Sequence, residues 1–426
     1  MTASLKFIHT SDLHLGTSFK GVRSLSSTWK NKLVKAIPEA FDRVISAAIE
    51  HQVDFLIISG DIFDSDRVSY GDYLRFFEGI KILSDKGIPT YLCTGNHDPY
   101  SFWQKKYFEL PESAYLFQAD APSFTVYERD GEPLCLLGGR GFKNQFWTED
   151  YEITDGITRK AAEESLSGVI AHPDLVPYAI GVAHTGLTVD KQIAPSDPQK
   201  LANAGMDYWA LGHIHQTYLY PSPDNPRVVF SGCIQGRDIN ETGMCSCFLV
   251  ELKEGQVNRL TPIPTSSVVW EKPEVSIEGC TSLPKIKEKI LAALNKLAQK
   301  NNGAAIVARV TLTGVNELHQ TLTSTALDDL RNDINDSSST AYLDALEKKT
   351  KAPIDLDAVR KEGMFPATFL TISDKMKENP QECLAYIQDL FAENNLRFDE
   401  TYTEDFSDLL GDAQELILDK LLRKES

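Results

Sequence analysis

The stretch VDFLIISGD, from Val53 to Asp61, decides the fold class of this chain of 426 residues. Its central residues are β-branched or otherwise apolar, and a glycine and an aspartate follow them at once. The run is apolar enough to be buried on both faces, which is typical of a strand in a parallel sheet that helices cover. The stretch therefore predicts an α/β fold.

The neighbouring segments repeat this arrangement of strand and helix. The runs LKFIHTSD (5–12) and IPTYLCTG (88–95) read as further strands. The stretches 37–51 and 70–87 lie between these strands and carry apolar residues at helical spacing. Similar strand-like runs continue to about residue 255. The alternation predicts a large mixed sheet system with helices packed on it.

The last third of the chain has a different character. Three prolines interrupt the segment 261–279, which we interpret as a domain boundary. A predicted helix (282–303) and a predicted strand (304–315) then form a small α+β unit. From about residue 336 the chain is polar, and then helical and acidic to its end. We expect three domains, with the ranges 1–265, 275–345 and 346–426.

Composition restricts the function classes. The net charge of −18 argues against a protein that coats nucleic acid, since such proteins are usually basic. Seven scattered cysteines indicate a reduced, intracellular protein, and we interpret Cys245 and Cys247 as strand residues. The N-terminus does not resemble a signal peptide, and no apolar run has membrane-spanning length. We therefore expect a cytoplasmic protein with no membrane partner.

Five of the predicted strands end in polar side chains of metal-binding type. A single histidine or aspartate after a strand is usually a loop residue, but five of the nine histidines fall in these places. The carboxyl ends of strands are where sites form in open α/β sheets, so the pattern predicts a metal site. The ordered series is Asp12 and His14, Asp61 and Asp64, Asn96 with His97 and Asp98, His184, and His213 with His215.

The ligand types indicate which chemistry the site performs. Carboxylate and amide oxygens mixed with imidazoles suit borderline divalent ions such as Mn, Fe or Zn. Because no cysteine belongs to the series, a structural zinc site is disfavoured. Seven ligands drawn from the ten residues of this series would be too many for one ion. They would suit two ions that share a bridging carboxylate. Two ions roughly 3.5–4 Å apart can clamp a phosphoester and activate its attacker.

The series resembles the motifs of the calcineurin-like metallophosphoesterases, over roughly residues 5–252. The resemblance implies a four-layer α/β/β/α sandwich with a small C-terminal α+β cap domain and a helical tail. It also implies that His97 faces the substrate, that Asp98 orients its imidazole, and that Asp64 supports a ligand or a loop. Loop capping is the alternative for both aspartates. The implied ligands are Asp12, His14, Asp61 and His215 for one ion, and Asp61, Asn96, His184 and His213 for the other.

Within this family the chain looks like the SbcD-type DNA repair nucleases, especially the bacterial YhaO-like group. The segments FIHTSDLHLG (7–16), GDIFDSDRVSYGDY (60–73) and SGCIQGRDINETG (231–243) carry this likeness. In the last segment, Arg237 and Glu241 either position substrate or loop, or form a surface salt bridge.

The likeness implies a metal-dependent DNA exonuclease or single-strand endonuclease in DNA repair. Manganese is the expected ion for both positions, with Fe, Zn or Mg as alternatives. A phosphatase or phosphodiesterase for nucleotides or other small phosphoesters is the alternative function. A scaffold without activity ranks last because all seven ligand positions are filled.

The same likeness implies DNA and a coiled-coil ATPase of the SbcC type as partners. The amphipathic tail 402–426 is a candidate docking segment, and packing on its own domain is equally open. The helices near 36–49 and 70–82 could pair two copies, although core packing is the commoner fate of such helices. The basic stretch 18–35, with Lys20 and Arg23, is a candidate DNA contact or a solvated helix face.

Overall fold

The computed structural model describes residues 4–19, 25–64, 68–103, 109–187, 193–394, 396–398 and 406–422. The chain divides into two units, the first of which consists of residues 1–272, 294–308 and 338–344. The second unit contains the rest of the chain. The three domain ranges expected from the sequence stay a prediction. None of the described helices has the length and apolar character that crossing a membrane requires.

Two six-stranded sheets form most of the first unit. One sheet contains β1 (Leu5–Thr10), β2 (Phe55–Ser59), β3 (Thr90–Cys93), β4 (Ala114–Leu116), β11 (Ser246–Lys253) and β12 (Gln256–Pro264), in the order β12-β11-β1-β2-β3-β4. Its strands β1 to β4 run parallel, β11 pairs antiparallel with β1, and β12 pairs antiparallel with β11.

The other sheet contains β5 (Ser123–Arg129), β6 (Glu132–Arg140), β7 (Tyr178–His184), β8 (Tyr208–Gly212), β9 (Tyr218–Tyr220) and β10 (Val228–Phe230). Their order is β5-β6-β7-β8-β10-β9. The four central strands run parallel, and the two edge strands are antiparallel to them. Both sheets therefore gather the carboxyl ends of their parallel strands at one edge.

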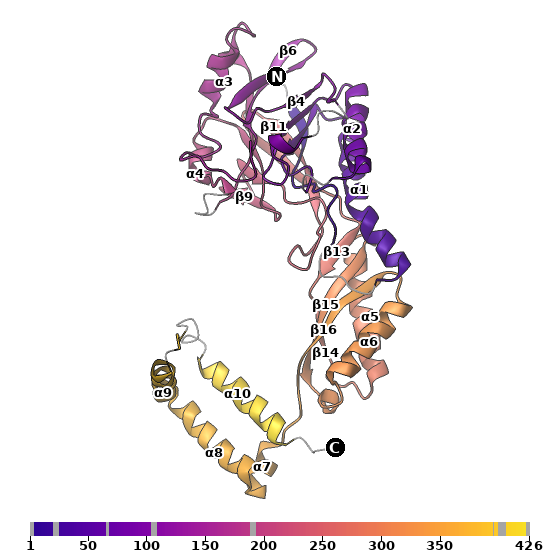
Figure 1. Ribbon diagram of the computed structural model, residues 1–426, viewed down its shortest axis with the longest axis vertical. Coiled ribbons are helices and arrows are strands. Elements are labelled where there is room, and N and C mark those ends of the chain that lie inside the picture. Colours follow the sequence, from indigo (N-terminus) through magenta and orange to yellow (C-terminus); the bar gives the residue numbers. More distant parts are fainter. Residues whose placement is uncertain are drawn as a thin grey trace. The chain divides into compact units, whose positions relative to one another are not determined.

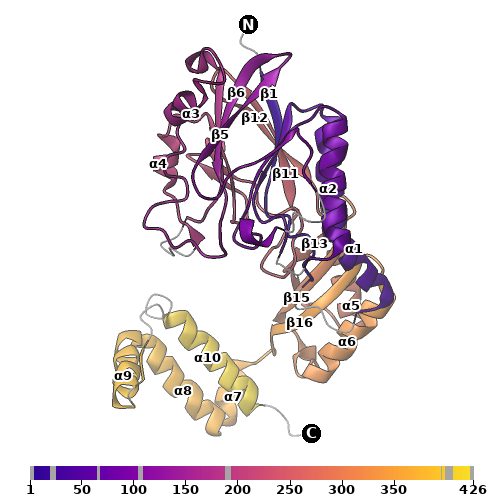
Figure 2. The same ribbon diagram turned by 45° about the horizontal axis from the view of Figure 1, so that its top comes forward.

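Helices cover the outer face of each sheet (Figure 2). The long helices α1 (Ser27–Glu50) and α2 (Tyr70–Asp85) pack on the first sheet. The shorter helices α3 (Arg159–Leu166) and α4 (Pro198–Ala202) pack on the second. A further apolar cluster fills the space between the two sheets. The layers are α/β/β/α, which confirms the predicted sandwich.

Strand β2 shows why VDFLIISGD specifies this fold. All five of its residues are buried. Phe55 and Ile57 belong to the cluster between the sheets, whereas Leu56 and Ile58 belong to the cluster beneath α1 and α2. Because side chains alternate between the faces of a strand, burial on both faces requires an unbroken apolar run.

Helix α1 begins ten residues earlier than the predicted start at residue 37, since it starts at Ser27. The Ser26 side chain accepts a hydrogen bond from the Trp29 amide and caps the helix. Trp29 is 1% exposed and packs in a cluster with Trp270 and Tyr342. The one described tryptophan of the basic stretch is therefore a core residue that cannot stack on DNA. Lys20 and Arg23 lie outside the described residues.

A third sheet contains β13 (Val268–Glu271), β14 (Glu274–Ser276), β15 (Ala305–Val315) and β16 (Ala341–Lys351). Its order is β13-β15-β14, with β16 paired to β15. The predicted helix and strand are found as α5 (Leu283–Lys300) and β15, and α6 (Ser324–Ser337) follows. Strand β16 was not predicted from the sequence, because the second half of that strand is charged and only partly buried.

The tail of the chain is helical, as predicted (Figure 1). It contains α7 (Leu356–Glu362), α8 (Phe365–Glu378), α9 (Pro380–Glu393) and α10 (Phe406–Leu421). Short 3-10 turns elsewhere cover Tyr100–Phe102, Pro173–Leu175 and Glu317–His319. On α10, Leu418 packs against Val359 and Leu370, while Leu416 remains 57% exposed. One face of the tail helix is therefore packed within its own unit, and another face is open.

A substitution at the centre of the sandwich should cause the largest loss of stability. Phe55 is fully buried, and its ring stacks on Phe7 at a centroid distance of 5.1 Å. Phe55→Ala should lower the free energy of unfolding by about 3–5 kcal/mol because it leaves a cavity. Val34→Ala, at a side chain 68% exposed, is the control and should change it by less than about 0.5 kcal/mol. Urea unfolding measures the free energy of unfolding of both variants. Equal losses in the two variants would contradict the assignment of Phe55 to the layer between the sheets.

Candidate metal centre

The candidate ligands follow strands of both sheets at their carboxyl ends. Asp12, Asp61 and Asn96 come just after β1, β2 and β3 of the first sheet. His184 is the last residue of β7, and His213 follows β8 in the second sheet. The two sheets thus bring residues from five distant segments to one edge of the sandwich, as expected for parallel strands.

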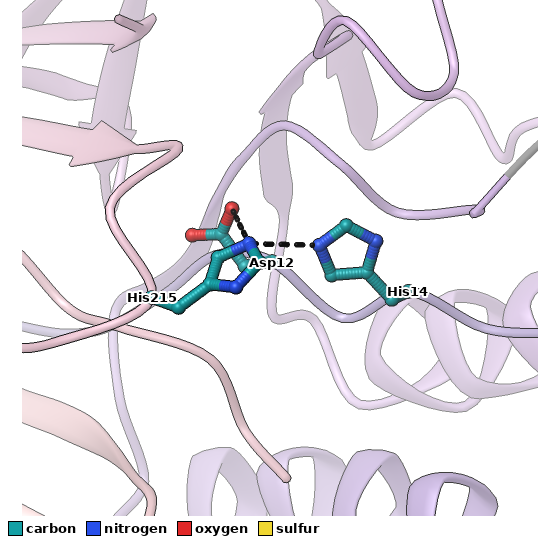
Figure 3. Close-up of side chains that lie close together, drawn as sticks. All are labelled: Asp12, His14 and His215. Atoms are coloured by element: carbon teal, nitrogen blue, oxygen red, sulfur yellow. Dashed lines mark hydrogen bonds and ion pairs between the residues drawn. The ribbon is translucent and has the colours of Figure 1, made fainter. Parts of the chain in front are cut away.

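Asp12, His14 and His215 form the first group (Figure 3). The Nε2 atoms of the two histidines lie 3.2 Å apart, and His215 Nε2 lies 3.7 Å from Asp12 Oδ1. His14 Nδ1 donates to Asp64 Oδ1 at 3.0 Å, and His215 Nδ1 donates to Glu241 Oε1 at 2.6 Å. Because a carboxylate only accepts, both neutral rings present an Nε2 lone pair to each other. This donor set suits a cation.

Asp61, His184 and His213 form the second group, and Asn96 joins them. His184 Nδ1 donates to the Ser59 carbonyl oxygen at 2.9 Å, so its Nε2 carries a lone pair. That lone pair faces Asn96 Oδ1 at 3.1 Å and Asp61 Oδ2 at 3.3 Å. Asn96 Oδ1 is also 3.1 Å from His213 Nδ1. Nitrogen and oxygen atoms of ligand type therefore converge here as well, and a cation or a proton between them would hold them together.

Asp61 connects the two groups through one oxygen. Its Oδ2 lies 3.3 Å from His184 Nε2 and 3.7 Å from His14 Nε2. Its Oδ1 accepts a hydrogen bond from the His97 amide. Burial opposes ionisation, but the neighbouring histidines, His184 first, hold the pKa of Asp61 well below its usual range. Asp61 therefore lies between the two groups, and its role as a bridging carboxylate stays a prediction.

Protons compete with a cation for these nitrogens. Burial disfavours a charge on His184, but Asp61 outweighs burial and raises the pKa of His184 to about 9. Burial likewise opposes a charge on His215, but its hydrogen bond to Glu241 raises its pKa. Burial lowers the pKa of His14, and burial together with His184 lowers the pKa of His213 to about 4. A metal-free site therefore keeps a proton on His184 near neutral pH, and the hydrogen bond to Glu241 favours proton binding at His215.

The backbone at the site is strained. Asp12, His14, Asp61 and His213 all have positive φ angles, of 51°, 47°, 49° and 98°. Residues other than glycine rarely adopt this left-handed conformation, and such strain concentrates at functional sites. Gly95 is required for a different reason, since a Cβ there would lie 2.1 Å from Asp61 Oδ1. The sequence places a glycine directly before Asn96, and the close approach of Asp61 explains why a side chain does not fit there.

A second layer of charged side chains holds the histidines. Asp64 Oδ1 contacts both His14 and Arg237, and the hydrogen bond to His14 lowers the pKa of Asp64 to about 2 although burial opposes it. Arg237 also donates to Glu241 Oε1 at 2.9 Å, and its side chain is 12% exposed. Its donors are directed at carboxylates of the site, which favours the loop-positioning role over contact with substrate. Asp64 lies where a supporting residue was predicted.

His97 lies at the open side of the site, and the prediction for Asp98 is wrong. The His97 side chain is 42% exposed, and its Nδ1 donates to the Asp64 carbonyl oxygen at 3.1 Å. Asp98 is 1% exposed and accepts from the amides of Gly95 (2.9 Å) and Ile62 (3.2 Å). It therefore fixes the turn that carries Asn96, as the loop-capping alternative states, and does not orient His97. Burial and Asp61 raise its pKa to about 8.

A buried polar network, which was not predicted from the sequence, lies beneath the ligands. His9 on β1 is fully buried, with Nδ1 2.9 Å from Tyr208 Oη and Nε2 3.1 Å from Ser59 Oγ. Burial lowers the pKa of His9 to about 3, so the ring is neutral. Ser59 in turn carries the carbonyl oxygen that holds His184. A histidine inside the apolar run LKFIHTSD was the available signal.

These protonation states predict a pH-dependent metal affinity. Because a divalent ion must displace the proton from His184, whose pKa is raised to about 9, its affinity should rise as the pH increases toward about 9, by about tenfold per pH unit for each proton displaced. Calorimetric titration with Mn²⁺ in two buffers of different ionisation enthalpy measures the protons released. A pH-independent affinity, or no proton release, would contradict the proposed ligand set.

Comparison with known protein families agrees with this geometry. Residues 5–217, half of the chain, match the family described as calcineurin-like phosphoesterase. Residues 270–350 match the middle domain of the metallophosphoesterase YhaO. The candidate clusters and this family together support the binding of divalent metal ions.

Individual relatives cover different shares of the chain. The uncharacterized metallophosphoesterase YhaO of Bacillus subtilis is 27% identical over 318 residues, 74% of this chain and 73% of that protein. The DNA double-strand break repair protein Mre11 of Methanococcus maripaludis is 34% identical over 229 residues, 53% of this chain and 55% of that protein. One of the subunits of the nuclease SbcCD of B. subtilis is 22% identical over 247 residues, covering 50% of this chain and 57% of that protein.

The chain spans little more than half the length of the Mre11 and SbcCD relatives. In this chain the strand ends of the sandwich carry the two candidate ligand groups, and Asp61 Oδ2 lies between them. By this sandwich and by the match over half of its length, the chain belongs to the calcineurin-like phosphoesterase family.

Proposed function

We propose that the protein is a dinuclear metal-dependent nuclease that hydrolyses phosphodiester bonds in DNA. The observation that carries this proposal is the single oxygen, Asp61 Oδ2, that faces both ligand groups, with His97 exposed beside them. Such an arrangement suits two ions and one phosphoester between them. The choice of DNA is supported by the names of the relatives, which include a component of the nuclease SbcCD and DNA double-strand break repair proteins.

In this proposal the seven ligands divide as the family resemblance implies. When bound, the two ions supply Lewis acidity and lower the pKa of water. Of the seven side chains only Asp12 and Asp61 are carboxylates, so two divalent ions leave an excess of positive charge at the site. Asn96 contributes an oxygen without adding negative charge. One set is Asp12, His14, Asp61 and His215, and the other is Asp61, Asn96, His184 and His213.

His97 is the residue that we assign to the leaving oxygen. When its ring is protonated, both nitrogens carry hydrogen. The Nδ1 hydrogen is bound to the Asp64 carbonyl oxygen, which fixes the ring. The Nε2 hydrogen is then available to the oxygen that leaves phosphorus, as general acid catalysis requires. The centroids of the His14 and His97 rings lie 5.0 Å apart, so the His97 ring lies next to the first ligand group.

The donor set of oxygens and imidazoles supports manganese as the ion, with Fe, Zn or Mg as alternatives. A coiled-coil ATPase of the SbcC type is the proposed partner, since one relative belongs to the nuclease SbcCD. Large apolar side chains are exposed on the C-terminal helices, among them Phe365 (68%) and Leu416 (57%), which supports protein docking there. A homodimer through α1 and α2 stays a prediction, because most apolar residues of both helices are buried in the fold.

A phosphodiesterase or phosphatase for small phosphoesters is the second candidate. The net charge of −18 favours it, since a long anionic substrate is repelled more strongly than a small one. The burial of Trp29 also removes one candidate DNA contact. Both functions use the same site, so they differ only in substrate.

Cleavage of end-labelled single- and double-stranded DNA with Mn²⁺ tests the proposal. His97→Ala should slow cleavage by about 10²- to 10⁴-fold, because a general acid is lost, while the bound metal is retained. His51→Ala, at an exposed histidine at the end of α1, is the matched control and should cleave normally.

Two results would change the assignment. Intact DNA together with rapid hydrolysis of a nitrophenyl phosphodiester would favour the small-substrate function, provided that a coiled-coil ATPase does not restore DNA cleavage. Normal cleavage by His97→Ala would remove His97 from the mechanism.

A further inference from the structure

Two cysteines lie in contact beside the metal centre. The Sγ atoms of Cys233 and Cys245 are 3.6 Å apart. All seven cysteines lie within the described residues, and Cys245 is the one that is partly exposed, whereas Cys233 is 2% exposed. The interpretation of Cys245 as a strand residue is wrong, because β11 begins at Ser246. Cys245 instead ends the loop that precedes this strand.

The backbone of each cysteine is held in place. The Cys233 amide donates to the His215 carbonyl oxygen at 3.1 Å, so this cysteine is bound directly to a candidate ligand. The Cys245 amide donates to Ser266 Oγ at 3.1 Å, and its carbonyl oxygen accepts from the Thr265 amide at 2.9 Å. The two sulfurs therefore meet across the base of a loop whose ends are fixed.

This loop, residues 234–244, is the segment that supports His215. It carries Glu241, which accepts from His215 Nδ1, and Arg237, which binds Glu241 and Asp64. The Gly243 amide donates to the Trp270 carbonyl oxygen near the end of the loop. A covalent link between Cys233 and Cys245 would close the loop at its base, because the two residues flank it.

We propose that Cys233 and Cys245 form a reversible disulfide when the protein meets a peroxide, and that the bond restrains the loop that holds His215. The sulfurs, 3.6 Å apart, must approach by about 1.5 Å to reach a bond length of about 2.05 Å. Neither residue belongs to the proposed ligand set, so the bond leaves the ligands themselves unchanged.

The chemistry balances with a peroxide as the only oxidant. The partly exposed Cys245 sulfur attacks one peroxide oxygen, the O–O bond breaks, and a sulfenic acid and one water are produced. The Cys233 sulfur then attacks the sulfenic sulfur, the S–O bond breaks, and a second water leaves with the Cys233 proton. The two thiols lose two electrons, which reduce the peroxide. Cys245 is partly exposed and Cys233 is 2% exposed, which agrees with Cys245 reacting first.

Mass spectrometry of the full chain after mild treatment with hydrogen peroxide tests the modification. The intact protein should lose the mass of two hydrogens, and a non-reducing digest should contain one cross-linked peptide joining Cys233 to Cys245. A thiol reductant should reverse both changes. Cys233→Ser and Cys245→Ser should each abolish the cross-link, whereas Cys383→Ser, which removes a buried thiol on α9, should keep it.

Two outcomes overturn the modification. In the first, peroxide converts Cys245 to a sulfinic acid while Cys233 remains a thiol. In the second, the cross-link joins other cysteines. Both readouts are independent of the substrate, so they stand whether or not DNA is cleaved.

Metal retention tests the second half of the proposal. Mn²⁺-loaded protein is challenged with a chelator before and after oxidation, and the metal that remains is measured over time. The oxidised protein should lose metal more slowly than the reduced protein, and oxidation should not slow the loss from Cys233→Ser. Equal rates for oxidised and reduced wild-type protein would show that the disulfide does not restrain the loop.

Discussion

The structure depends on a set of acceptor atoms that face one another. His14 and His215 present Nε2 atoms at 3.2 Å, and His184 Nε2 faces two oxygens. Lone pairs at such distances repel unless a cation or a proton lies between them. The surrounding contacts maintain this unfavourable arrangement, because Asp64, Glu241 and the Ser59 carbonyl oxygen each hold the other nitrogen of a ring. The fold thus uses strain and charge to prepare a cation site in advance.

Parallel strands explain how such distant residues meet. Each ligand segment leaves a strand at its carboxyl end, and the chain must then turn at once to aim a side chain back over the sheet. The left-handed backbone at Asp12, Asp61 and His213 is this turn. Crowding at the same edge excludes a side chain at residue 95, so glycine precedes the amide ligand Asn96. The positions of the ligand Asn96 and of the glycine before it both follow from the crowding at this edge of the sheet.

Much of the fold and site could be predicted from the sequence, because both rest on local patterns. Unbroken apolar runs indicated the buried strands, and the polar residues after them indicated where the site lies. The predictions failed where contacts between distant segments determine the partner of a side chain or the place of a strand. Asp98 looks like a partner for its neighbour His97, yet its carboxylate binds the amides of Gly95 and Ile62. Strand β16 is charged along its second half, and its pairing with β15 gives it a place that periodicity did not reveal.

The buried network of His9, Ser59 and Tyr208 bears on how firmly the two sheets are registered. Apolar packing has no preferred direction, so two sheets held by it alone resist separation better than they resist sliding. Ser59 Oγ, on the first sheet, donates to the Ala210 carbonyl oxygen of the second sheet at 2.9 Å. His9 joins the same sheets through Tyr208. These directional bonds oppose shear directly beneath the ligands, and together with the bond from His184 Nδ1 to the Ser59 carbonyl oxygen they help to fix the spacing between ligands of different sheets.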